Sequence, residues 1–183
     1  MSNIKVKEGN GERVLLHTCC APCCAPSGER MMNDGYKITL FYSNSNIFPE
    51  SEYIKRLNEA RKLAKIWQVD LIEDSWDHRE WLDFVKGFER EPEGGKRCER
   101  CFEFNLRRTA QKAKELDFPY YTTTLTLGPY KNSRMIFGIA EKYPGFLEYN
   151  FKKKNGFLRS LELSREYNFY RQNYCGCEFS FRD

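Results

Sequence analysis

The segment VLLHTCCAPCCAP, residues 14–26, joins a short apolar run to four cysteines. Such a run predicts a buried strand, and the polar and proline-containing residues after it predict a loop at the carboxyl end of that strand. A phosphate-binding loop in this position would be rich in glycine, but no glycine lies between Gly11 and Gly28. The segment therefore argues against nucleotide phosphate binding and favours a cradle of thiols for a metal.

Outward from this segment, apolar strands alternate with amphipathic helices. After the strand at 14–16 we expect strands at 37–42, 69–72 and 120–127, and helices at 27–33, 49–67, 77–88, 98–116 and 132–143. This alternation is typical of a three-layer α/β fold with a parallel sheet covered on both faces. Ligands of such folds bind beyond the carboxyl ends of the strands. We expect four segments to meet there: the cysteine cluster, the asparagine-rich loop 43–46, Asp74 with Asp77, and Leu127 with Gly128.

Length and composition indicate a single α/β domain spanning residues 1–183. A chain of 183 residues with 40% hydrophobic and 31% charged residues can bury its own core. We expect a flexible N-terminus at 1–12, which is polar and charged, and a basic, aromatic C-terminal segment at 150–183. No apolar run of about 18 residues and no signal-like segment is visible, which predicts no membrane partner and a cytoplasmic location. Thiols are kept reduced in that compartment.

The eight cysteines fall into three groups, which suggests a chemical use. The groups are Cys19, Cys20, Cys23 and Cys24; Cys98 and Cys101; and Cys175 and Cys177. Buried structural cysteines would be scattered, so the grouping indicates metal, redox or nucleophilic chemistry. Spacing alone leaves three alternatives open: an iron–sulfur cluster, structural zinc and a redox site without metal.

The last group is a C-x-C motif with Gly176 between the two cysteines. Glycine frees the backbone to bring the two sulfurs together, and a disulfide across so short a span is strained and easily reduced. The motif therefore favours a redox-active pair, with two further metal ligands as the alternative.

The formal net charge of +4 arises in one stretch of the chain. Residues 150–171 contain six lysines and arginines against two glutamates, and aromatic rings are interleaved with them. Cations for phosphates and rings for stacking suit an RNA-binding surface, and a solvated face over a small aromatic core is the alternative. The candidate RNA-binding residues are Lys152, Lys153, Arg159, Tyr170, Arg171, Gln172 and Tyr174.

Three motifs together resemble the QueH family of epoxyqueuosine reductases. They are LHTCCAPC at 16–23, RCERCF at 97–102 and YRQNYCGCEFS at 170–180. The linking segment YTTTLT at 121–126 and the pair Tyr130 and Lys131 are also similar, so the resemblance extends over nearly the whole chain.

The resemblance implies the reduction of epoxyqueuosine to queuosine at the wobble position of tRNA. It implies an adenine-nucleotide α-hydrolase-like, Rossmann-like fold and a [4Fe-4S] cluster. The cluster ligands that it implies are Cys19, Cys20, Cys98 and Cys101, and Cys175 with Cys177 would form a redox-active pair. The implied partners are tRNA containing epoxyqueuosine and an unidentified electron donor.

Cys23 and Cys24 remain beside the expected cluster as two further thiols. We expect them either to exchange roles with Cys19 or Cys20, or to hold an additional iron ion completed by a carboxylate such as Asp77. For the protons of the reaction, Lys131 and His17 are the candidate donors. Two other functions stay open on the residues alone. One is a zinc-stabilised RNA-binding module, and the other is a sulfur-transferring tRNA-modification enzyme, which would need an ATP loop that is absent here.

Overall fold

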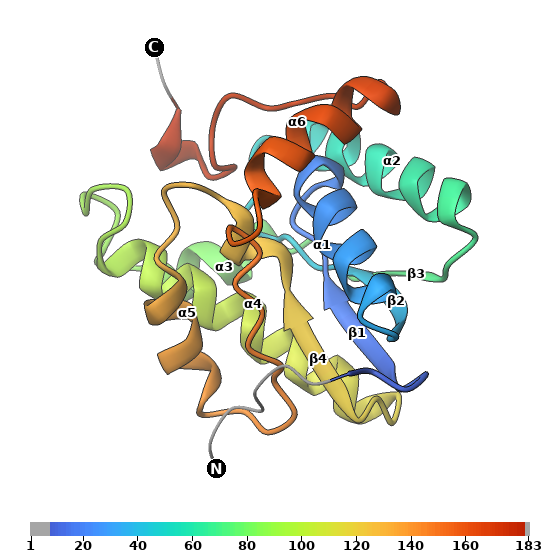
Figure 1. Ribbon diagram of the computed structural model, residues 1–183. Coiled ribbons are helices and arrows are strands. Elements are labelled where there is room, and N and C mark those ends of the chain that lie inside the picture. Colours follow the sequence, from blue (N-terminus) through green and yellow to red (C-terminus); the bar gives the residue numbers. More distant parts are fainter. Residues whose placement is uncertain (1–7, 182–183) are drawn as a thin grey trace.

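The computed structural model describes residues 8–181, and its centre is a four-stranded sheet (Figure 1). The strands are β1 (Arg13–His17), β2 (Lys37–Tyr42), β3 (Leu71–Glu73) and β4 (Tyr120–Thr123). Their order is β3-β2-β1-β4, and all neighbouring pairs are parallel. The expected α/β class is confirmed, as a Rossmann-like arrangement with helices on both faces of a parallel sheet.

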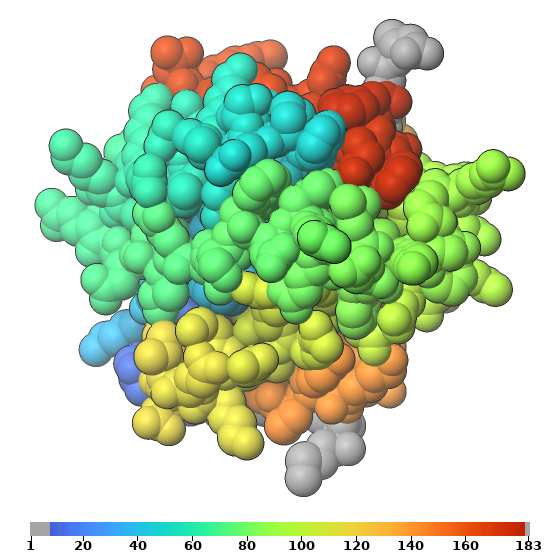
Figure 2. All heavy atoms as spheres, turned by 180° about the vertical axis from the view of Figure 1, so that it is seen from behind, coloured from blue at the N-terminus to red at the C-terminus, as the bar shows by residue number. Residues whose placement is uncertain are grey.

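Helices cover both faces of this sheet. In chain order they are α1 (Ala21–Asn33), α2 (Glu50–Trp67), α3 (His78–Val85), α4 (Lys96–Glu115), α5 (Ser133–Ala140) and α6 (Gly156–Glu166), with short 3-10 helices η1 (Thr124–Leu127) and η2 (Glu178–Ser180). Successive residues of a strand point to opposite faces. Val14 and Leu16 therefore pack with α1, α2 and α6, whereas Leu15 packs with α4 and α5. In Figure 2 the C-terminal segment, in red, lies beside α3 and the loop that follows it, in green.

The second half of the opening segment is helical and not the expected loop. α1 begins at Ala21, Cys20 is its N-cap, and Pro22 lies in the first turn. Proline is tolerated there because first-turn N–H groups have no partner within the helix. Cys23 and Cys24 are therefore on α1, and the four cysteines surround the amino end of a helix.

The expected strand at 120–127 ends at Thr123. The Thr123 hydroxyl accepts a hydrogen bond from the Leu125 N–H at 3.2 Å, and the chain turns there into η1. Threonine is common in strands, but its hydroxyl can compete for backbone N–H groups in this way. The turn directs the following loop across the carboxyl ends of the strands, which was not predicted from the pattern.

The described residues near both ends of the chain contact the rest of the fold. Residues 1–7 and 182–183 lie outside the described residues, but Gly9 and Gly11 donate their N–H groups to the carbonyls of Asp34 and Gly35 at 2.7 and 2.8 Å. This part of the expected flexible N-terminus is therefore held against the turn between α1 and β2. The basic C-terminal segment contains α6, which packs on α1. No helix within residues 8–181 has the length and apolar character needed to cross a membrane.

A close approach of α1 to α2 gives a test of this packing. A Cβ at Gly28 of α1 would lie 2.6 Å from Trp67 and 3.0 Å from Ile38. Alanine is the better helix former by about 1 kcal/mol, but overpacking costs about 1–3 kcal/mol. We therefore expect Gly28→Ala to lower the free energy of unfolding, measured by urea denaturation.

Gly138 of α5 provides the matched control, because a Cβ there would meet nothing within 4 Å. Gly138→Ala should raise the free energy of unfolding by about 0.5–1 kcal/mol. Equal effects of the two substitutions would contradict the close packing of α1 against Trp67.

Candidate functional site

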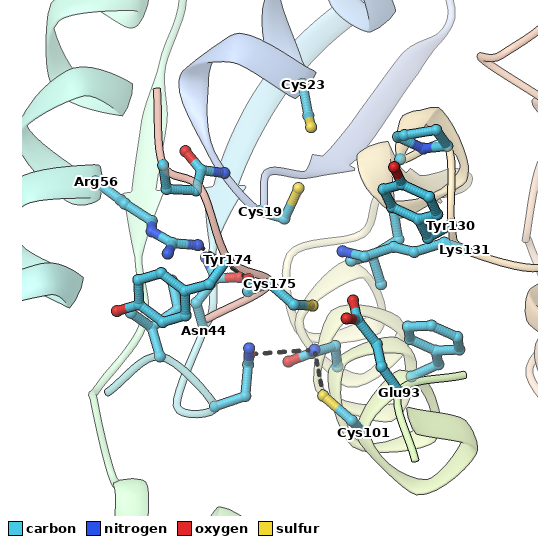
Figure 3. Close-up of a pocket in the computed structure, with 18 of the residues that line it drawn as sticks. Cys19, Cys23, Asn44, Arg56, Glu93, Cys101, Tyr130, Lys131, Tyr174 and Cys175 are labelled. Carbon is cyan, nitrogen blue, oxygen red and sulfur yellow. Dashed lines mark hydrogen bonds between the residues drawn. The ribbon is translucent and has the colours of Figure 1, made fainter. Parts of the chain in front are cut away.

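A cavity of about 250 Å³ opens at the carboxyl ends of β1, β2 and β4. The segments that follow these three strands line it, and α4 and residues 171–175 complete its wall (Figure 3). The expectation that the segments after the four strands meet at one site is thus met for three of them. A smaller cavity adjoins it and shares Glu93, Phe102, Tyr130, Lys131 and Cys175.

His17 ties these strand ends together below the cavity. Its Nε2–H donates to the Ser43 carbonyl at 3.0 Å, and its Nδ1 lies 2.8 Å from the Thr123 hydroxyl. Burial lowers the pKa of His17, so the ring is neutral. His17 is fully buried and is not among the residues that line the cavity. Its place therefore supports a structural role and does not favour the expected one as a proton donor.

Three sulfurs form a compact group at the start of α1. The Sγ atoms of Cys19, Cys20 and Cys23 lie within 4.8 Å of one another. Hydrogen bonds with Cys19 and Cys23 hold the pKa of Cys20 well below its usual range, whereas hydrogen bonds with Cys19 and Cys20 raise the pKa of Cys23. Such a donor set, with one sulfur held as thiolate, fits a soft metal ion or an iron–sulfur cluster.

Cys24 does not belong to this group. It is fully buried in the core with Leu16 and Met31, and its Sγ lies 3.4 Å from the Thr18 hydroxyl. Burial raises the pKa of this thiol. Adjacent residues of a helix point in different directions, which separates Cys24 from Cys23. The thiol of Cys24 is part of the core, which does not favour the expectation that it binds a metal beside Cys23.

Cys98 and Cys101 lie on α4, across the cavity from α1. Cys101 lines the main cavity, where Asn105 Nδ2 lies 3.8 Å from its Sγ (Figure 3). Cys98 lines the adjoining cavity and accepts a hydrogen bond from the Gly94 N–H at 3.2 Å. Burial raises the pKa of both thiols. The fold thus brings the C-x-x-C to the same site as the first group, although neither thiol lies within the compact group of three.

The C-x-C motif is held by its backbone. Phe48 N–H donates to the Gly176 carbonyl at 2.9 Å, and Arg56 Nη1 donates to the Cys175 carbonyl at 3.0 Å. Gly176 has φ of +145°, and a Cβ there would lie 3.2 Å from Ile47, so other residues would be strained. Cys175 lines both cavities, whereas Cys177 is buried beside Trp81. Both are free thiols in the structure.

Lys131 and Glu93 are the charged groups at the junction of the two cavities (Figure 3). Burial alone would lower the pKa of Lys131, but the surrounding cysteines, Cys175 first, raise it, so the side chain remains an ammonium. Glu93 stands five residues before Cys98, in a loop rich in glycine. Its proximity to the C-x-x-C was the signal in the sequence that could have identified it.

The carboxylates expected from the end of β3 are bound elsewhere. Asp77 caps α3 by accepting a hydrogen bond from the Glu80 N–H at 2.9 Å. Asp74 binds Arg108 and Ser43, both at 2.7 Å. Neither lines the cavity, which does not favour the expectation that Asp77 completes a metal site there.

The expected RNA-binding residues divide into two sets. Arg171, Gln172 and Tyr174 line the cavity. The others contact the protein itself: Arg159 pairs with Glu29 and Glu162, Tyr170 donates to Glu52, and Lys152 donates to the Lys131 carbonyl, while Lys153 is exposed. Among these candidate residues, Arg159 is the cation that is paired with carboxylates of the fold.

Two aromatic rings at the cavity mouth were not among the expected RNA-binding residues. Tyr130 is 74% exposed and Phe157 is 41% exposed, and both line the cavity. Such rings can stack on unpaired bases.

A parallel α/β sheet with thiols and an ammonium gathered at its strand ends defines a thiol-rich oxidoreductase with a cysteine group suited to metal. The family model described as epoxyqueuosine reductase QueH matches residues 14–183, and the chain belongs to this family of oxidoreductases.

Relatives carry the same description. The epoxyqueuosine reductase QueH of Histophilus somni is 38% identical over 177 residues, which cover 93% of this chain and 73% of the relative. That of Acinetobacter baylyi is 37% identical, over 98% of this chain and 86% of the relative. That of Thermotoga maritima is 38% identical, over 91% and 89% respectively.

The contrast between Cys23 and Cys24 predicts different effects of replacing them. After anaerobic reconstitution with iron and sulfide, Cys23→Ala should bind less iron per chain, measured by mass spectrometry of the metal. Cys24→Ala should bind as much iron as the original chain, while its unfolding free energy falls by about 1–2 kcal/mol because a core group is lost. A folded Cys24→Ala that binds less iron would contradict the assignment of this thiol to the core.

Proposed function

We propose that this protein reduces epoxyqueuosine to queuosine at the wobble position of tRNA. The observation that carries the proposal is the shared cavity, in which Cys19, Cys23, Cys101 and Cys175 lie together with Lys131, in a chain of this family. The curated relatives are named for the same reduction.

We propose a [4Fe-4S] cluster as the cofactor, with an additional iron ion beside it. Cys19 and Cys20 are ligands in this assignment, and Cys98 and Cys101 approach from the opposite wall. The position of Cys23, within 4.8 Å of the first two sulfurs, supports adding it to the metal-binding group. When bound, such a centre supplies electrons one at a time and a Lewis-acidic site for oxygen.

Cys175 and Cys177 supply the reducing equivalents in this proposal. Oxidation of two thiols to one disulfide releases two electrons and two protons, and loss of the epoxide oxygen as water consumes the same number. The carbon–oxygen bonds of the epoxide break, a carbon–carbon double bond remains, and one sulfur–sulfur bond forms. An external reductant, the unidentified electron donor, must then reduce the disulfide.

Lys131 is the proton donor that the geometry favours. Its ammonium lies in the cavity with Cys175, so it can protonate the epoxide oxygen as the bond breaks and regain a proton from the thiol. His17 remains a weaker candidate, because both of its ring nitrogens are already hydrogen bonded.

The tRNA partner fits the mouth of the same cavity. The modified base must leave the anticodon stack to reach a cleft, and proteins hold such bases between aromatic rings and phosphates with cations. Arg171, Gln172 and Tyr174 at the cavity, with Lys152, Lys153, Arg159 and Tyr170 nearby in the chain, are the proposed contacts.

Removal of one thiol tests the proposed reaction. Cys175→Ser should abolish turnover on epoxyqueuosine-containing tRNA under anaerobic conditions, measured by mass spectrometry of the released nucleosides, while iron content stays unchanged. Cys24→Ala is the matched control and should retain turnover, because its thiol lies in the core. Turnover by Cys175→Ser at the original rate would exclude an essential dithiol.

The role of Lys131 can be separated from its charge. Both Lys131→Met and Lys131→Arg should lower kcat by about 10²–10⁴-fold, because neither side chain can give up a proton at neutral pH. Lys142→Met removes a surface ammonium that pairs with Glu103 and should leave kcat unchanged. Recovery of kcat in Lys131→Arg would show that charge alone is required.

A further inference from the structure

Arg56 on α2 is a buried arginine that the proposed reaction does not use. Its side chain is 2% exposed, and its guanidinium reaches the main cavity (Figure 3). Nε donates to Glu52 at 2.6 Å, and Nη1 donates to the Cys175 carbonyl at 3.0 Å. Nη2 is also buried but has no hydrogen-bond partner among residues 8–181.

An unpartnered N–H on a buried cation is costly. A buried donor left without an acceptor loses about 1–3 kcal/mol, and more when the group is charged. Buried polar groups are therefore almost always paired in folded proteins. Because Arg56 lines the cavity, the missing acceptor of Nη2 is best explained by a group that enters the cavity from outside the chain.

The lining of the cavity indicates which acceptor this is. Arg56 lines it together with Cys19 and Cys23 of the compact sulfur group. Glu52 is already bound by Nε, and Glu93, the carboxylate that lines the cavity, lies on its other side beside Cys101 (Figure 3). Cys20 is 1% exposed and lies in the compact group with Cys19 and Cys23.

We propose that Arg56 is a positioning residue that donates Nη2–H to sulfur of the metal centre on Cys19, Cys20 and Cys23, while its Nη1 holds the backbone of Cys175. This inference rests on the metal centre of the proposed function. Accepting an electron makes such a centre more negative, and a fixed hydrogen-bonded cation stabilises that state. Arg56 therefore raises the reduction potential of the centre and holds the redox-active thiol at the same cavity.

If Arg56 had only a structural role, its substitution would have a different effect on the reduction potential. Arg56 also lies 5.0 Å from the Tyr174 ring centroid, so it could simply anchor the C-terminal segment. An anchor of that kind would have no effect on the reduction potential. Lysine at this position keeps a positive charge but cannot reproduce the planar arrangement of N–H donors. Arg56→Lys therefore separates the effect of the charge on the potential from the effect of the hydrogen bond.

The reduction potential of the reconstituted, metal-loaded protein is the measurement that tests this inference. In redox titrations followed by electron paramagnetic resonance, Arg56→Lys should lower the midpoint potential and Arg56→Gln should lower it further. We expect at least a tenfold shift in the ratio of reduced to oxidised centre for Arg56→Gln, which is 59 mV for one electron. Arg61→Gln, on the exposed side of the same helix where Arg61 pairs with Glu73, should have the original potential.

Removal of Arg56 alone would leave Glu52 buried without its cation, which can prevent folding. The double substitution Glu52→Gln and Arg56→Gln removes both charges and should still lower the potential, but by less than Arg56→Gln, because loss of the Glu52 carboxylate offsets part of the loss of the cation. Unchanged potentials in the metal-loaded variants would overturn the inference but not the proposed function. If those variants also had a raised KM for tRNA, Nη2 would be assigned to the substrate instead. Absence of a redox-active centre in the original protein would overturn both.

Discussion

One buried histidine holds the strand ends on which the site is built. The ring of His17 bridges the Ser43 carbonyl after β2 and the Thr123 hydroxyl at the end of β4. All three residues are buried, so loss of either contact would leave a polar group unpaired away from water, at about 1–3 kcal/mol. The directions in which Cys19, the loop 44–47 and η1 leave the sheet are set by this bridge.

The cysteines of this chain differ in chemical character because their surroundings differ. Hydrogen bonds with two other thiols lower the pKa of Cys20, whereas Cys24 lies in an apolar core where the charged form is disfavoured. Cys175 and Cys177 are two residues apart, yet one lines the cavities and the other packs beside Trp81. The fold produces this division by the turn at the start of α1 and by the backbone hydrogen bonds of the C-x-C.

The features of the fold that depend on local sequence pattern could be predicted. The strand at 37–42 and most of the long helix after it follow from periodicity, and the three cysteine groups were visible from spacing. The end of β4 at Thr123 depends on a hydroxyl that binds a neighbouring N–H, which periodicity does not contain. Asp77 was expected at the site because it follows a strand, but the α3 N-terminus binds it, and Glu93 lies there instead. Arg56 looked like an ordinary cation of an amphipathic helix, and its burial became apparent only with the C-terminal segment in place.

The walls of the cavity come from segments that lie far apart in the sequence. Cys19 and Cys23 are synthesised well before residues 171–175, which line the same cavity. The sheet is complete once β4 has been made, so the core can form while the first thiols still lack the wall that shields them. A chain truncated before Arg171 would keep all four strands and yet present these sulfurs to oxygen and to unselected metal ions. Shielding of these sulfurs therefore depends on residues 171–175, and damage to that segment would be detected first as oxidation of Cys19 and Cys23.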